Sequence, residues 1–164
     1  MIVNSEIWGV MLTKENSHHR LGSTIVNIYN SKIGYGTRIA NFCEVGGATI
    51  GIGCRIQAFS FIPPGTSIGD NVFLGPRTTI LNDRYPYIRD SCPNGFPIFV
   101  PEGVIICDHV VIGGSVTIMA GVTIGEGAKI GAGTLITKDV PAGAVVMGAP
   151  GREYEDRWVI TPHG

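Results

Sequence analysis

The amino-acid sequence predicts an all-β fold, a parallel β-helix of six-residue repeats with one extruded loop. Two observations predict it. Apolar residues recur at every sixth position, with one slip to five, and many of the chain's 24 glycines directly follow these apolar anchors. The anchors are Ile33, Ile39, Val45, Ile50, Ile56, Ile62, Ile68, Leu74 and Ile80 before the loop, and Val100, Ile106, Ile112, Ile118, Ile124, Ile130, Ile136 and, more weakly, Ala142 after it.

The six-residue period excludes helices from the repeat region. An amphipathic α-helix repeats about every 3.6 residues, and each interior glycine would cost it about 1 kcal/mol. Six residues make one short strand and a turn, which cannot bury an apolar face alone, so successive units must coil and stack. Three units per coil give a triangular prism with the anchors inside and glycines at the turns. A sandwich of short strands would instead alternate with period two.

The repeat divides the chain into segments. Residues 1–24 show no repeat, and we expect them to form an end cap or a subunit contact. Residues 25–152 form the β-helix domain, which is interrupted by a loop at residues 82–99. Residues 153–164 are a short polar tail that we expect to pack on the outside.

Composition excludes several classes of function. A net charge of −1 with 15% charged residues leaves no basic stripe for nucleic acid. The apolar run at residues 7–12 is interrupted by Gly9 and is too short for a membrane span or a signal peptide, so we expect a cytoplasmic protein without membrane contact. The four cysteines have no C-x-x-C spacing, and the repeat lacks the three histidines of a zinc hydratase site, so no metal is expected.

Counting hexads gives a candidate ligand lane. With three hexads per coil and about fourteen extra residues for the loop, Asn82, Gly114 and Ala132 stack in one column, and neighbouring coils lie about 4.8 Å apart. The small residues Gly114 and Ala132 would leave a shallow lane for a long thin ligand. The backbone amides along it suit a pantetheine arm.

Several hexads carry a family resemblance. The segments "IGDNVF", "IGEGAK" and "IGAGTL" resemble the hexapeptide-repeat acyltransferase superfamily over roughly residues 33–152. The resemblance implies a left-handed β-helix and a homotrimer.

The C-terminal coils resemble one branch of that superfamily. The stretch "IGAGTLITKDVPAGAVVMGAPGR" is similar to coenzyme A-dependent acetyltransferases, including the galactoside and maltose O-acetyltransferases. This implies that Gly114, Ala132, Thr137, Lys138 and Arg152 contact acetyl-CoA. Lys138 and Arg152 also suit its phosphates, because charge-assisted hydrogen bonds are about twice as strong as neutral ones.

The loop resembles another branch. "VFLGPRTTIL" followed by Asn82, Asp83, Arg84 and Tyr85 resembles the N-acyltransferases of 3-amino sugars carried on UDP or dTDP. This implies that Asn82 orients the sugar amine without a side-chain base. From their chemistry, we expect Asp83, Arg84 and Tyr85 beside it to contact the substrate. Asn41, in "IANFCEV", matches a substrate-contacting asparagine of the galactoside enzymes.

The expected function is therefore acetyl transfer from acetyl-CoA to the amine of a UDP- or dTDP-linked amino sugar, in surface polysaccharide synthesis. The loop contains no histidine, and an amine needs less help from a base than a hydroxyl does. The first alternative is a sugar O-acetyltransferase with a base recruited from Asp83 or His109. The second is a non-catalytic β-helix scaffold.

Overall fold

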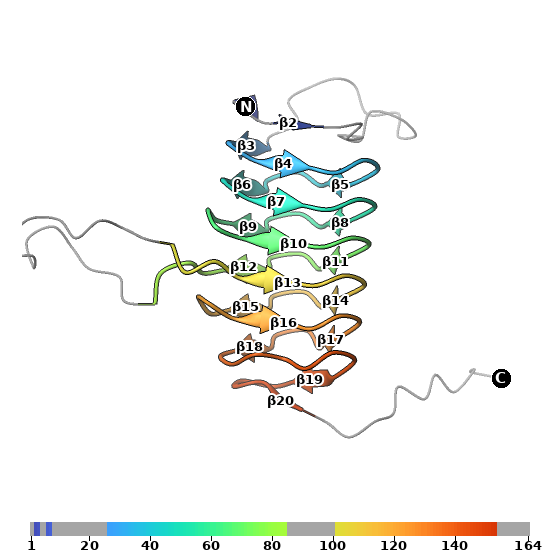
Figure 1. The fold of residues 1–164 in the computed structure, drawn as a ribbon. Coiled ribbons are helices and arrows are strands. Elements are labelled where there is room, and N and C mark those ends of the chain that lie inside the picture. Colours follow the sequence, from blue (N-terminus) through green and yellow to red (C-terminus); the bar gives the residue numbers. More distant parts are fainter. Residues whose placement is uncertain (1, 4–5, 8–25, 85–100, 154–164) are drawn as a thin grey trace, which may run out of the picture.

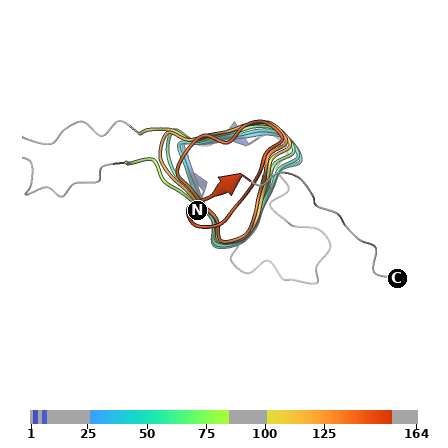
Figure 2. The ribbon, with the colours of Figure 1, turned by 90° about the horizontal axis from the view of Figure 1, so that it is seen from below.

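The structure is a computed structural model that describes residues 2–3, 6–7, 26–84 and 101–153. These residues wind into a left-handed β-helix with three sheets and a triangular cross-section (Figures 1 and 2). The predicted fold class is confirmed. Within this part of the chain no helix is long and apolar enough to cross a membrane.

The three faces of the prism are sheets of very short strands. Sheet A contains β1 (Ile2–Val3), β3 (Asn27–Tyr29), β6 (Glu44–Gly46), β9 (Phe61–Ile62), β12 (Thr79–Ile80), β15 (Thr117–Ile118) and β18 (Leu135–Ile136). Sheet B contains β2 (Glu6–Ile7), β4 (Lys32–Ile33), β7 (Thr49–Ile50), β10 (Ser67–Ile68), β13 (Ile105–Ile106) and β16 (Thr123–Ile124). Sheet C contains β5 (Arg38–Ile39), β8 (Arg55–Ile56), β11 (Phe73–Leu74), β14 (Val111–Ile112), β17 (Lys129–Ile130), β19 (Val145–Met147) and β20 (Arg152–Glu153).

The core is a set of stacked apolar columns. In most strands the first residue faces outward and the second is buried, as in β12, where Ile80 is fully buried. Parallel pairing places equivalent residues above one another, so Ile80 stacks on Ile118 and Ile118 on Ile136. Burying one such side chain contributes roughly 1.5–3 kcal/mol of transfer free energy.

Buried hydroxyls complete the turns between sheets C and A. Ser60, Thr78 and Thr134 point inward and donate hydrogen bonds to the carbonyls of Gln57, Gly75 and Gly131 at 2.7–2.8 Å. Turn carbonyls would otherwise lie unpaired beside the core, which is costly. This explains why small polar residues follow the anchors at these positions.

One predicted anchor differs from the structure. Ala142 is exposed, and Val140 takes the inward position by bridging to Ile124, because the last coil is shorter: Lys129 pairs with Val145, sixteen residues on. Val100 lies outside the described residues. The other predicted anchors are all buried.

The loop is longer than predicted. Ser67 pairs with Thr49, eighteen residues earlier, and with Ile105, thirty-eight residues later. The chain therefore inserts twenty residues beyond one coil, whereas the sequence reading allowed about fourteen. The difference is one hexad, and it moves every later residue to the next face of the prism.

The two ends of the β-helix are also built from strands. At the N-terminus, β1 and β2 pair with β3 and β4 and extend sheets A and B by one coil. At the C-terminus, β20 runs antiparallel to β19 and ends sheet C. Most of residues 1–24 and all of 154–164 lie outside the described residues, so their expected roles stay predictions.

Candidate functional site

Each edge of the prism is a column of turns. The AB edge follows sheet A, the BC edge follows sheet B, and the CA edge follows sheet C. The AB edge contains Pro64, Asn82, Ala120 and Lys138. The BC edge contains Ile52, Asp70, Asp108 and Glu126. The CA edge contains Asn41, Ala58, Pro76, Gly114 and Ala132.

The predicted single column of Asn82, Gly114 and Ala132 is wrong. Asn82 lies on the AB edge, whereas Gly114 and Ala132 lie on the CA edge. The cause is the longer insertion, which shifts the coils after the loop by one face. The CA edge does form a column of small residues, but Asn41 stands in it and Asn82 does not.

Asn82 is held at the base of the insertion. Its side chain is half-buried, and its Nδ2 donates a hydrogen bond of 3.0 Å to the carbonyl of Pro64, one coil away. Its own carbonyl accepts a hydrogen bond of 2.9 Å from the backbone N–H of Glu102. Because one amide N–H is engaged by Pro64, the amide oxygen and the second N–H are the groups that Asn82 can offer to a ligand.

Arg84 and Glu102 join the two ends of the insertion. Arg84 Nε lies 3.3 Å from Glu102 Oε2, and an Arg84 terminal nitrogen donates 2.8 Å to the carbonyl of Ala120. Gly121 leaves room for the pair, because a Cβ there would lie 3.1 Å from the guanidinium. Its φ of +75° also disfavours a side chain. Both ends of the insertion are therefore attached to the β-helix.

Glu102 is a site residue that the sequence did not predict. Its signal is the Pro-Glu-Gly turn at residues 101–103, where the repeat resumes. The expected contact of Arg84 with substrate stays a prediction, and the structure adds that its guanidinium already has partners. Asp83 is half-buried beside Asn82, and Tyr85 lies outside the described residues.

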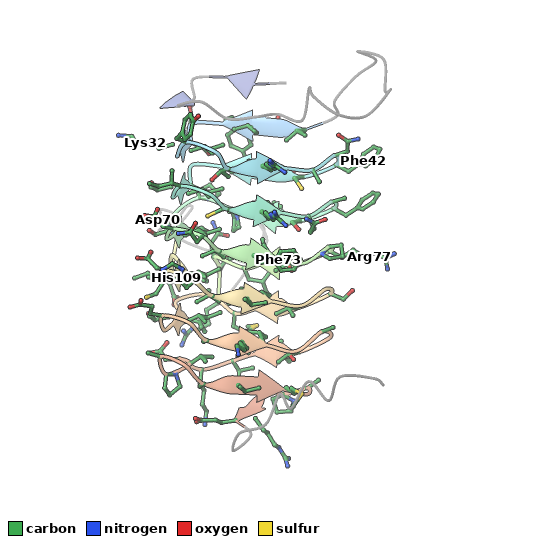
Figure 3. The ribbon with its side chains drawn as sticks, turned by 90° about the vertical axis from the view of Figure 1, so that its right-hand side faces the viewer. Lys32, Phe42, Asp70, Phe73, Arg77 and His109 are labelled. Carbon is green, nitrogen blue, oxygen red and sulfur yellow. The ribbon has the colours of Figure 1, made fainter. Side chains whose placement is uncertain are left out.

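His109 stands apart from Asn82. It is an exposed turn residue on the BC edge with a φ of +60°. Its backbone N–H donates a hydrogen bond of 2.9 Å to the carbonyl of Asp70. Figure 3, which faces sheet C, shows Asp70 and His109 along one edge and Phe42 and Arg77 along the other. His109 is the only histidine among the described residues, and in these residues no three metal-ligating side chains come together.

The residues expected to contact acetyl-CoA gather in the C-terminal coils. Gly114 and Ala132 are neighbours on the CA edge, and a Cβ at Gly114 would press on Pro76 at 3.3 Å. Thr137 and Lys138 line a pocket of about 230 Å³ together with Pro150 and Gly151. Arg152, in β20, is exposed next to this pocket. The pocket brings two of the five residues together, and Lys138 lies two coils beyond Asn82 on the same edge.

Known proteins share the repeat. Residues 47–82 and 103–138 match the bacterial transferase hexapeptide family (six repeats), on both sides of the loop. The bifunctional protein GlmU of Aromatoleum aromaticum is 35% identical over 99 residues, which cover 55% of this chain and 21% of that protein. The chain thus spans about a fifth of the length of this relative.

Two solved structures resemble the whole β-helix. AntD, an N-acyltransferase from Bacillus cereus in complex with dTDP and 3-hydroxybutyryl-CoA, is 26% identical with a TM-score of 0.73, covering 93% of this chain and 82% of AntD. PerB from Caulobacter crescentus, in complex with CoA and GDP-perosamine, is 16% identical with a TM-score of 0.62, covering 94% of this chain and 58% of PerB. The likeness to PerB shows the fold alone.

Proposed function

Residues 47–82 and 103–138 match the bacterial transferase hexapeptide family, and on that basis we propose that the chain is a transferase of this kind, which transfers the acetyl group of acetyl-CoA to the amine of a UDP- or dTDP-linked amino sugar. The observation that carries the proposal is Asn82, whose amide nitrogen is engaged by Pro64 so that its oxygen can accept an N–H bond. The likeness to AntD, an N-acyltransferase in complex with dTDP and an acyl-CoA, supports the substrate class.

The reaction needs positioning more than acid–base catalysis. The free amine attacks the thioester carbon, a C–N bond forms, the C–S bond breaks, and the departing thiolate takes up the proton that the amine loses. Asn82 accepts one amine N–H and directs the lone pair, which is the kind of orientation that lowers a bimolecular barrier most. His109, on the BC edge, has no role in this scheme.

We place acetyl-CoA along the C-terminal coils. Lys138 and Arg152 provide cations for its phosphates, Thr137 lines the pocket beside them, and Gly114 and Ala132 provide a bare edge for the pantetheine arm. Asp83, Arg84 and Tyr85 at the loop, with Asn41 on the CA edge, are the proposed acceptor contacts.

A homotrimer would complete the site. Asn82 and the Gly114–Ala132 edge lie at opposite borders of sheet A, so one hexad, at most roughly 20 Å of extended chain, separates them within one subunit. A second copy that packs its CA edge against the AB edge would bring the two together. The proposed site therefore takes Asn82 from one subunit and the pantetheine lane from the next.

The reaction is tested with paired acceptors. Purified protein is incubated with acetyl-CoA and either a UDP- or dTDP-linked amino sugar or its hydroxyl counterpart, and released thiol is measured. Faster release with the amine is expected. Faster release with the hydroxyl would establish the O-acetyltransferase, and no release with no CoA binding in calorimetry would establish the scaffold.

The shared site is tested by complementation. At acetyl-CoA concentrations well below KM, Asn82→Ala and Ala132→Trp are each expected to lose most of the activity, and subunits mixed by unfolding and refolding together are expected to regain it. Mixed subunits with no regained activity, at a trimeric mass in light scattering, would place the site within one chain.

A further inference from the structure

Two arginines lie side by side on the outer face of sheet C. Arg38 and Arg55 are register partners in β5 and β8, and both are exposed. Neighbouring strands are only about 4.8 Å apart, and like charges at such positions destabilise a sheet. Among the described residues neither guanidinium has a carboxylate partner. In the part of the chain that the structure describes, these two positive charges are left for a ligand or solvent to compensate.

The two arginines border a cavity. It measures about 360 Å³ and is lined by Arg38, Ala40, Asn41, Arg55 and Gln57, with Ile39 and Ile56 in its floor. This volume is in the usual range for small-molecule sites, about 300–1,000 Å³. Each guanidinium can donate two parallel hydrogen bonds to the oxygens of one phosphate, and the Asn41 and Gln57 amides add further donors. The donor set suits a diphosphate.

Two stacked aromatic rings adjoin the cavity. Phe42 follows Asn41, and its ring lies parallel to that of Phe59 in the next coil, with centroids 4.9 Å apart and 9° between the planes. Both are exposed, at 49% and 58%, and both have left-handed φ angles of +62° and +63°. The same left-handed φ recurs at other turns of the β-helix, as at Arg77 and His109, so it places the two rings at turn tips. The stack presents a flat apolar surface of the kind on which a nucleobase packs.

The level of the cavity fits a two-substrate reaction. Arg55 lies one coil and Arg38 two coils to the N-terminal side of the coil that holds Asn82, or roughly 5–10 Å along the axis. Gly114 and Ala132 lie one and two coils to the C-terminal side. A diphosphate and one sugar ring span a comparable length, so the acceptor amine and the thioester would meet at the level of Asn82.

We propose that the cavity of Arg38, Asn41, Arg55 and Gln57 binds the diphosphate of the nucleotide-linked acceptor, with its base on the Phe42–Phe59 stack. The inference rests on the proposed function and on the shared site, since the Asn82 that orients the amine of this acceptor would belong to a neighbouring subunit. Coenzyme A also contains a nucleoside with a diphosphate, and the test separates the two sources.

Calorimetry on the full chain tests the site with UDP, dTDP, GDP, adenosine 3′,5′-bisphosphate and inorganic pyrophosphate as probes. The double variant Arg38→Gln/Arg55→Gln is expected to weaken binding of at least one nucleoside 5′-diphosphate by about 10- to 100-fold. Phe59→Ala should weaken the binding of that nucleotide and leave the affinity for pyrophosphate unchanged. The matched control is Lys129→Gln, an exposed cation on the same sheet, which should change neither; equal melting temperatures show that the variants fold.

Three outcomes would overturn the inference: no nucleoside 5′-diphosphate bound by the unaltered protein, an unchanged affinity in the double variant, or a loss confined to adenosine 3′,5′-bisphosphate. The proposed function has a separate readout. It is thiol release by the unaltered protein with acetyl-CoA and a free amino sugar, and such release without binding of any nucleoside 5′-diphosphate would refute the cavity and leave the N-acetyltransferase standing.

Discussion

The AB and CA edges border the same sheet but are built differently. Along the CA edge one turn follows another without a break. Phe42 and Phe59 project from its N-terminal half, whereas its C-terminal half has the small residues Gly114 and Ala132. Along the AB edge the chain departs after Asn82 and returns at Glu102. A periodic edge gives a long wall that can support an extended ligand, whereas an interrupted edge can place a single polar group. The proposed chemistry needs both.

The largest expected effect concerns the interior that both edges share. Ile118→Ala removes a fully buried side chain stacked between Ile80 and Ile136, so it should lower the free energy of unfolding by about 2–5 kcal/mol in urea titrations. Thr117→Ala, which changes an outward side chain of the same strand, should cost less than about 0.5 kcal/mol. Equal losses would mean that the core of sheet A does not support the edges.

The second effect separates the edges by function. Asn82→Ala should lower kcat with the amino-sugar substrate about 100-fold, because the amine loses its orienting acceptor. The dissociation constant for CoA should stay within about twofold, since this edge position does not form the lane. Thr49→Ala, on sheet B, is the control and should leave both unchanged. Normal turnover in Asn82→Ala would refute the amine-holding role.

The third effect tests whether the CA edge binds acetyl-CoA. Ala132→Trp fills the CA edge and should raise KM for acetyl-CoA by about tenfold, or roughly 1.4 kcal/mol, through steric exclusion. Ala142→Trp is its counterpart, an exposed alanine before a glycine on the BC edge. The comparison fails if the two substitutions raise KM equally.

A smaller effect concerns the fastening of the insertion. Arg84→Met removes the ion pair with Glu102, in which both side chains are nearly half exposed, at 47% and 45%, so it should cost only about 0.2–1 kcal/mol of stability. The KM for the acceptor should rise a few-fold, because the loop base also holds Asn82. Arg77→Met, an exposed arginine on the CA edge, is the control. An unchanged acceptor KM would show that the pair does not position the site.

The smallest effect depends on pH. Burial raises the pKa of the Cys43 and Cys54 thiols above their ordinary value of 9.0, and the Asp70 carboxylate adds to this at Cys54. The folded chain keeps these protons where the unfolded chain loses them, so their stabilisation is complete below about pH 9 and declines above it. Urea midpoints at pH 7 and 10 should differ less in Cys43→Ala/Cys54→Ala, and an unchanged difference would contradict this.

The sequence predicted the core well and the edges poorly, for a physical reason. An inward anchor such as Ile112 is identified by its spacing to the nearest neighbours alone. The face on which it lies depends on every residue counted before it, so an error of one hexad in the loop moved Gly114 and Ala132 off the edge of Asn82. A count restricted to residues on one side of the loop stays correct.

Side-chain partners were the other gap. The Arg84–Glu102 pair joins residues across the insertion, and no local pattern signals it. Arg38 and Arg55 do have a signal, since the same Arg-Ile dipeptide recurs one coil apart, and Phe42 and Phe59 recur with the same spacing. Comparing outward positions coil by coil would have revealed both pairs.

The hydrogen bond from the Glu102 N–H to the Asn82 carbonyl joins the two ends of the insertion. The coils on either side can keep their register with a longer insertion between these two residues, because each doubling of loop length raises the entropic cost of loop closure by only about 0.6 kcal/mol. Under the proposed function, an insert of another sequence between these two residues would present a different acceptor to the same coenzyme while the coils stay as they are.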